Sequence, residues 1–211
     1  MDTKHPPFDA RIEDIELFLK HMTKIRPGGV ATITGGEPTM YPYLEEVSSL
    51  IREYGFKVGM LTNGYKLQPL ELFDLVVLDN HGINEPQIEK WKKVLENSNV
   101  EWEIIGKQYH QDIAHVIKDN ITRGVHCDQW LGTLTLYQNV VYHCCNIMCV
   151  EWWSDTFEMS EALIDAGWTI ENPNLPETVK NWRETLPSEV YRLCSIGCWK
   201  DAQDPKWEKI K

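Results

Sequence analysis

Hydrophobic positions between Arg11 and Ile121 follow two alternating spacings. Apolar residues three or four apart predict amphipathic helices, and short runs rich in β-branched residues predict strands. In chain order, the pattern predicts a helix over Arg11–Ile25, a strand over Val30–Thr34, a helix over Tyr43–Tyr54, strands over Phe56–Leu61 and Leu75–Asp79, a helix over Pro86–Glu96, a strand over Val100–Ile105 and a helix over Gln111–Ile121. Strands that recur about every 20–25 residues with helices between them indicate βαβ units and parallel strands, so the predicted fold class is α/β.

The last third of the chain has a different pattern. Two β-rich runs within Thr133–Cys144 flank Gln138-Asn139, and asparagine tolerates the left-handed conformation that a two-residue turn needs. These residues therefore predict a β-hairpin with Cys144 opposite Thr133. The chain that enters the hairpin comes from Cys127, so the hairpin can bring Cys127 close to Cys144.

These two patterns predict two domains. Residues 1–122 would form the α/β domain, and residues 123–211 would form a smaller, cysteine-rich module. Besides the hairpin, this module is expected to contain a helix near Glu158–Ala166, ended by Gly167, and a second helix near Pro176–Leu186.

Composition excludes several classes of partner and location. The 211 residues are 42% hydrophobic and 25% charged, which is typical of a globular protein. A net charge of −11 repels phosphate backbones, so we expect no nucleic-acid partner. No apolar run approaches the roughly 20 residues that span a bilayer, and Met1–Ala10 lacks a signal-peptide core. We therefore expect no membrane interaction and a cytoplasmic location, where six cysteines indicate metal or redox chemistry more than disulfides.

The first candidate for ligand binding is Gly35-Gly36-Glu37-Pro38, at the carboxyl end of a predicted parallel strand. Ligands of α/β proteins lie at such strand ends. The two glycines allow a ligand close to the backbone, where carbonyl oxygens can accept hydrogen bonds from an ammonium group, and Glu37 adds negative charge. Taken alone, the tetrapeptide is equally compatible with a tight strand-to-helix turn.

A second motif, Thr62-Asn63-Gly64, ends the next predicted strand. With this order of elements, residues from about Asp9 to Gln111 resemble the radical S-adenosylmethionine (radical SAM) superfamily. The resemblance implies a partial (β/α) barrel in which the GGEP residues face the amino group of S-adenosylmethionine. The residues that it places at the cofactor are Gly35, Gly36, Glu37, Pro38, Thr62, Asn63, Asp79 and His81.

The sequence departs from this family in one respect. The family's CxxxCxxC loop holds the 4Fe-4S cluster that cleaves the cofactor, whereas no cysteine precedes Cys127 here. Three interpretations are open: the sequence is a fragment, a separate polypeptide carries the CxxxCxxC segment, or the chain is a degenerate relative. Cys145 and Cys149 have CxxxC spacing, but Trp152 stands where a third cysteine is needed. We therefore do not expect the chain alone to cleave S-adenosylmethionine.

The cysteines themselves form the third candidate site. A cysteine before a hairpin, a second at its end and more downstream resemble the auxiliary-cluster modules called SPASM or Twitch. The resemblance favours four ligands to a 4Fe-4S cluster, with two alternates: Cys127, Cys144, Cys194 and Cys198, with Cys145 and Cys149. Zinc is an alternative, because His126 and His143 flank two of these cysteines and mixed Cys/His sites suit Zn²⁺. A third reading is that the thiols are small buried residues.

Two hypotheses about function follow. In the first, the chain is a radical SAM-type enzyme, or the larger part of one. It would use reductive cleavage of S-adenosylmethionine to a 5′-deoxyadenosyl radical and act on a peptide or protein. In the second, it is a non-catalytic scaffold with one zinc or iron–sulfur site. A zinc-stabilised α/β enzyme with His81 or Glu37 as acid–base groups is a weaker third reading, because no nucleophile–base pair supports it.

Overall fold

The computed structural model describes residues 10–80, 82–105, 134–142 and 167–185. The chain divides into two compact units, one made of residues 1–21 and 111–207 and the other of residues 22–110 and 208–211. The division falls within helix α1 (Ile12–Ile25), directly after His21. The predicted boundary between residues 122 and 123 lies outside the described residues and stays a prediction.

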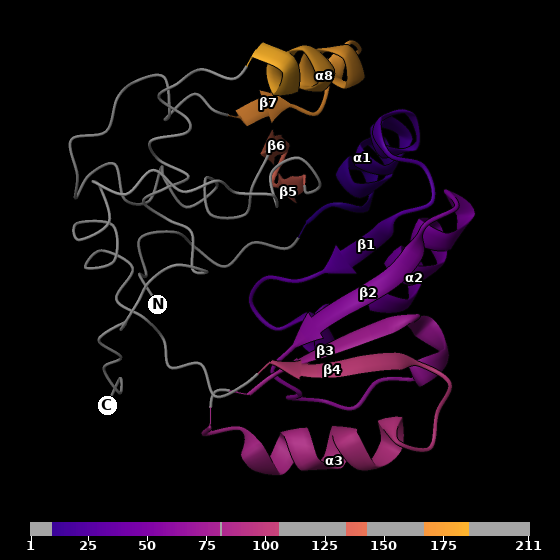
Figure 1. Ribbon diagram of the computed structural model, residues 1–211, viewed down its shortest axis with the longest axis vertical. Helices are drawn as coiled ribbons and strands as arrows, with labels where there is room; N and C mark the ends of the chain where they lie inside the picture. Colours follow the sequence, from indigo (N-terminus) through magenta and orange to yellow (C-terminus); the bar gives the residue numbers. More distant parts are fainter. Residues whose placement is uncertain (1–9, 81, 106–133, 143–166, 186–211) are drawn as a thin grey trace, which may run out of the picture. The chain divides into compact units, whose positions relative to one another are not determined.

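The second unit contains a sheet of four parallel strands (Figure 1). The strands are β1 (Val30–Ile33), β2 (Lys57–Thr62), β3 (Leu75–Asp79) and β4 (Glu101–Ile105), and their order in the sheet is their order in the chain. Each predicted strand is present with bounds shifted by at most one residue. The prediction of an α/β fold is confirmed.

Helical segments connect these strands. Between β1 and β2 lie a 3₁₀ turn, η1 (Pro38–Met40), and helix α2 (Leu44–Glu53). Between β2 and β3 lies a second 3₁₀ turn, η2 (Leu70–Leu72), and between β3 and β4 lies helix α3 (Glu85–Leu95). Right-handed crossovers between strands in sequential order place the connecting helices on one face of a sheet.

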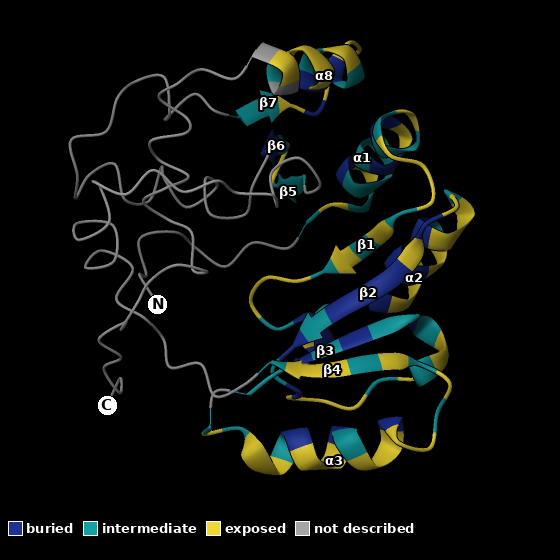
Figure 2. Ribbon diagram, viewed as in Figure 1, coloured by how far each residue is buried: buried dark blue, intermediate teal, exposed yellow. Residues whose placement is uncertain are grey.

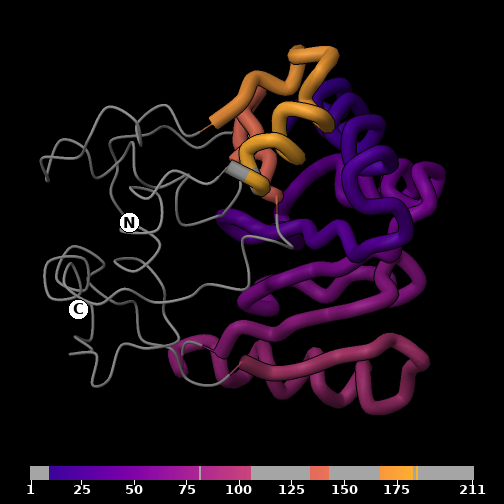
Figure 3. Tube along the Cα trace, turned by 45° about the horizontal axis from the view of Figure 1, so that its top comes forward, coloured from indigo at the N-terminus to yellow at the C-terminus, as the bar shows by residue number. Residues whose placement is uncertain are grey.

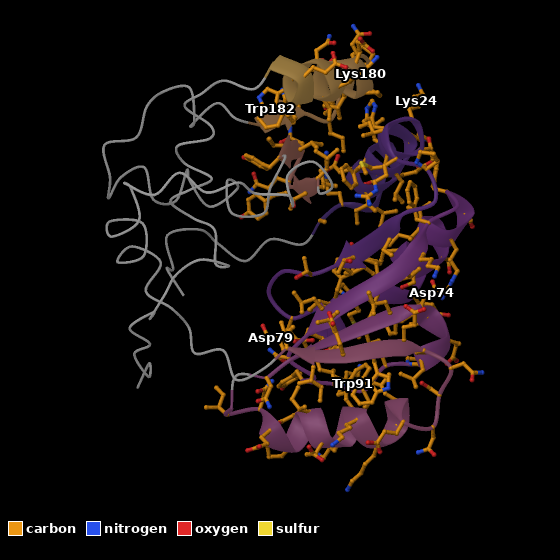
Figure 4. All side chains as sticks on the ribbon, viewed as in Figure 1. Lys24, Asp74, Asp79, Trp91, Lys180 and Trp182 are labelled. Atoms are coloured by element: carbon orange, nitrogen blue, oxygen red, sulfur yellow. The ribbon has the colours of Figure 1, made fainter. Side chains whose placement is uncertain are left out.

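The core of this unit lies on one face of the sheet (Figure 2). Met60 of β2 is in register with Val76 of β3, and Thr62 is in register with Leu78. Val58, Met60, Val76 and Leu78 have no exposed surface. Trp91 of α3 is equally buried and points from the helix toward the sheet (Figure 4). Burial of these apolar side chains fixes which face of each strand points inward.

The predicted hairpin is present in the first unit. Strands β5 (Thr135–Tyr137) and β6 (Val140–Tyr142) are antiparallel, and Thr135 pairs with Tyr142. The left-handed residue of the turn is Gln138, with φ +54°, and not Asn139, to which the sequence analysis gave this conformation. This register is the one from which we placed Cys144 opposite Thr133, but both of those residues lie outside the described part of the chain.

A third strand, β7 (Gly167–Thr169), pairs antiparallel with β6 and was not predicted. Gly167, which we expected to end a helix, is instead the first residue of β7; the expected helix before it lies outside the described residues. A side chain at this position would collide with Val140 and Tyr142, so the close strand pairing accounts for the glycine.

Helix α8 (Leu175–Thr185) confirms the second predicted helix and lies beside these strands (Figures 1 and 3). The Trp168 and Trp182 rings meet edge to face with centroids 5.2 Å apart. His21 Nε2 of α1 lies 2.9 Å from the carbonyl oxygen of Ile170, so the start of α1 belongs to this unit. Within the described ranges, no helix is long and apolar enough to cross a membrane.

Candidate functional site

The loop after β1 carries two glycines in left-handed backbone conformations. Gly35 has φ +92° and Gly36 has φ +49°, backbone angles that residues other than glycine and asparagine rarely adopt. A Cβ atom built at either position meets no other atom within 4 Å, and both residues are exposed. This open backbone allows a ligand to approach closely.

Glu37 joins this loop to the end of β2. Its Oε1 accepts hydrogen bonds from the Thr39 amide at 3.0 Å and the Thr39 hydroxyl at 2.6 Å. The same oxygen accepts one from the Thr62 hydroxyl at 2.5 Å, and Oε2 accepts one from the Asn63 amide at 3.0 Å. The structure therefore brings together Glu37, Thr62 and Asn63, three residues that the resemblance assigned to one site.

The described hydrogen bonds of the Glu37 carboxylate are made within the protein, where they hold two loops together. The expected action of its charge on a ligand stays a prediction. Pro38 begins η1 and is buried, so its part is to start this turn.

Hydrogen bonds within the Thr62-Asn63-Gly64 turn also fix its conformation. The Thr62 hydroxyl, which donates to Glu37, also accepts from the Gly64 amide at 2.9 Å. Asn63 Oδ1 accepts from the Tyr65 amide at 3.0 Å, which is an Asx turn. Trp91 Nε1 donates to the Gly64 carbonyl at 3.2 Å. The side chains of Thr62 and Asn63 therefore shape the turn.

Asp79 ends β3 at the same edge of the sheet, and Figure 4 shows it at the opposite end of this strand from Asp74. Asn84 Nδ2 donates to the carbonyl oxygens of both Asn63, at 2.7 Å, and Asp79, at 2.8 Å. One amide group thus joins the ends of β2 and β3. His81, the other residue expected at this edge, lies outside the described residues.

Sequence reasoning missed Thr39, Asn84 and Trp91. Asn84 precedes a helix that begins with Glu85-Pro86, so the sequence suggests an N-cap, but its side chain makes no capping hydrogen bond. Thr39 is buried and bonds to residues 27 and 29 positions away, at Lys66 and Gln68. These contacts depend on tertiary structure, which no local motif encodes.

The described residues hold no group of three or more His, Cys, Asp or Glu side chains that could bind a metal ion. All the predicted metal ligands lie outside the described part of the chain: Cys127, Cys144, Cys194 and Cys198, with the alternates Cys145 and Cys149. Their convergence stays a prediction.

A pocket of about 470 Å³ lies at the opposite edge of the sheet, where β2, β3 and β4 begin. Arg52 and Asp74 line it, with Arg52 Nη2 3.5 Å from Asp74 Oδ2, and the same carboxylate oxygen accepts from the Val58 amide at 2.8 Å. These bonds hold the sheet's amino-terminal edge. In barrel-like α/β folds this edge serves stability, and ligands bind at the other one.

Comparison with known proteins finds a similarity over part of the chain. No family model matches the chain. In an alignment 91 residues long that covers 38% of the chain, it is 30% identical to the S-adenosyl-L-methionine-dependent tRNA 4-demethylwyosine synthase of Methanocaldococcus jannaschii. The chain covers 29% of the length of that protein. In this part of its sequence, the chain is thus similar to an S-adenosylmethionine-dependent enzyme.

Proposed function

We propose that the chain is a radical SAM-type enzyme, or the larger part of one, that binds S-adenosylmethionine at the loops after β1 and β2. The observation that carries the proposal is the Glu37 carboxylate, which holds the turn at Thr62 and Asn63 against a loop with two left-handed glycines. The similarity to an S-adenosylmethionine-dependent enzyme supports the same cofactor. When reduced by an iron–sulfur cluster, S-adenosylmethionine supplies radical chemistry.

The chain's own residues would bind and orient this cofactor. Backbone carbonyl oxygens next to Gly35 and Gly36 are suited to accept hydrogen bonds from its ammonium group, and the nearby Glu37 charge favours a cation. The hydrogen bonds of Glu37 and Asn84 keep three strand ends in one arrangement before the ligand arrives. Such preorganisation lowers the cost of binding.

The proposed substrate is a peptide or protein. The relative's name assigns it a tRNA substrate, but the net charge of −11 disfavours an RNA partner for this chain. Cleavage of S-adenosylmethionine would require a CxxxCxxC segment from outside these 211 residues. We propose that a longer form of this chain or a separate polypeptide partner carries it.

Metal analysis of anaerobically prepared protein tests the cluster part of the proposal. We expect iron with equimolar sulfide and a visible charge-transfer band, because four thiolates suit a 4Fe-4S cluster. Replacing Cys127 or Cys198 by serine should remove the iron and the band, whereas replacing the exposed Ser49 by cysteine should change neither.

Zinc without sulfide would instead support the alternative, a non-catalytic scaffold with one zinc site. In that case chelation should lower the melting temperature, because metal ligation is part of the folding free energy. Protein that contains neither metal would contradict both readings.

A further inference from the structure

Four exposed apolar side chains follow directly after the two motifs of the candidate site. Met40 and Tyr43 come after the GGEP loop and are 57% and 51% exposed. Tyr65 and Leu67 come after the turn at Gly64 and are 66% and 46% exposed. We call these four residues the apolar rim. Exposed clusters of large apolar side chains beside a site commonly mark an interaction surface.

Hydrogen bonds hold the two segments of the apolar rim side by side. The Thr39 hydroxyl accepts from the Lys66 amide at 3.2 Å, and the Thr39 carbonyl accepts from Gln68 Nε2 at 2.7 Å. Thr39 itself is buried and bonded to Glu37. The rim is therefore fixed by the same hydrogen-bond network as the candidate site. Little conformational entropy would then be lost in these segments when a partner binds.

The composition of the rim indicates the kind of partner. Tyrosine and methionine are enriched in protein-binding surfaces, whereas carboxylates are depleted there. The exposed carboxylates Glu45 and Glu46, in the first turn of α2, lie two and three residues after Tyr43. The exposed cation Lys66 lies between Tyr65 and Leu67, but the whole chain carries a charge of −11. The electric field of this net negative charge attracts cationic partners and repels anionic ones.

We infer that the apolar rim binds a peptide segment whose apolar or aromatic side chains are flanked by Lys or Arg. Its apolar side chains would cover the rim, and its cations would face Glu45 and Glu46. The inference rests on the proposed function, since it places a peptide substrate beside the loops that would bind S-adenosylmethionine.

The test measures binding of two labelled peptides to the 211-residue chain by fluorescence anisotropy, without S-adenosylmethionine. One peptide has central Phe and Leu residues between pairs of Lys, and the other has Glu in place of each Lys. We expect the lysine peptide to bind and to weaken as salt is raised. The double variant Met40→Ser/Tyr65→Ser should bind it at least about tenfold less tightly, as expected for loss of interface anchors.

The matched control is Val94→Ser, which changes an apolar side chain that is 41% exposed on α3, outside the rim. It should leave peptide affinity unchanged, and the melting temperatures of both variants should stay close to that of the parent chain. If the double variant does not fold, Tyr65→Ser alone is tested in its place. Tyr65 is the most exposed side chain of the rim and contributes least to the core.

Several results would overturn the inference: no binding of the lysine peptide, equal binding of the glutamate peptide, or an affinity that the rim variants do not change. Binding of a single-stranded RNA that the rim variants abolish would also overturn it. The assay omits S-adenosylmethionine, so it tests the rim separately from the cofactor site. If the chain binds the peptide but not S-adenosylmethionine, the proposed function is refuted and the inference about the rim still holds.

Discussion

Replacing Glu37 by alanine is expected to lower the free energy of unfolding by about 3 kcal/mol, because several donors lose their shared acceptor. The affected groups are the amide and hydroxyl of Thr39, the hydroxyl of Thr62 and the amide of Asn63. Thr39 and Thr62 are each only 2% exposed, so water cannot easily replace the carboxylate. Urea denaturation of the variant and the parent chain measures the difference.

Two further variants make this result specific. Glu37→Gln keeps one acceptor oxygen but turns an NH₂ group toward a donor, so we expect an intermediate loss of about 1–2 kcal/mol. Glu89→Ala removes an exposed carboxylate from the middle of α3 and should change stability by less than about 0.5 kcal/mol. An equal, small effect of all three substitutions would mean that Glu37 does not hold the two loops together.

Replacing Trp91 by alanine is expected to cost about 3–5 kcal/mol, the usual range for a buried tryptophan. Trp91 has no exposed surface, and its Nε1 donates to the Gly64 carbonyl at 3.2 Å. A Cβ atom at Gly64 would lie 3.1 Å from Trp91 Cδ1, so the indole packs directly against the turn. The loss of stability thus has two causes: a cavity in the core and the release of the turn at Gly64.

Hydrogen exchange separates these two contributions. Trp91→Phe keeps most of the packing but removes the donor, so we expect a smaller loss of stability together with faster exchange at the Gly64 and Tyr65 amides. Val94→Ala, on the same helix but 41% exposed, should cost less than about 1 kcal/mol and leave this exchange unchanged. If Trp91→Phe left exchange in the turn unchanged, Trp91 would serve the core alone.

The sequence predicts the parallel sheet well because each strand carries its own local signal. The continuous apolar run at Leu75–Asp79 is β3, with the bounds that we predicted, and the glycines after β1 mark its loop. The strand at Gly167–Thr169 was missed for the opposite reason. It is too short for periodicity to appear, and it forms because β6, distant in sequence, offers an edge.

The sequence placed three residues of the candidate site at neighbouring strand ends, but it did not predict the contacts that support them. The motifs place Glu37, Thr62 and Asn63 at neighbouring strand ends, as the structure has them. Asn84 could not be recognised as the link between two strand ends, because its partners at Asn63 and Asp79 come together only in the folded sheet. Convergence of the cysteines also depends on tertiary structure, and it stays a prediction.

The most direct test of this account is the affinity of the chain for S-adenosylmethionine, measured by isothermal titration calorimetry. Gly36→Asn is the informative variant, because asparagine tolerates the left-handed conformation at φ +49° while its side chain fills the open space beside the loop. Gly28→Asn is the matched control, at φ +72°, with similarly open space and no place in the candidate site.

We predict that the parent chain and Gly28→Asn bind one S-adenosylmethionine per chain with equal affinity, and that Gly36→Asn binds at least about tenfold less tightly, a loss of about 1.4 kcal/mol. Absence of binding to the parent chain, or equal binding by Gly36→Asn, would contradict the assignment of this loop as the cofactor site.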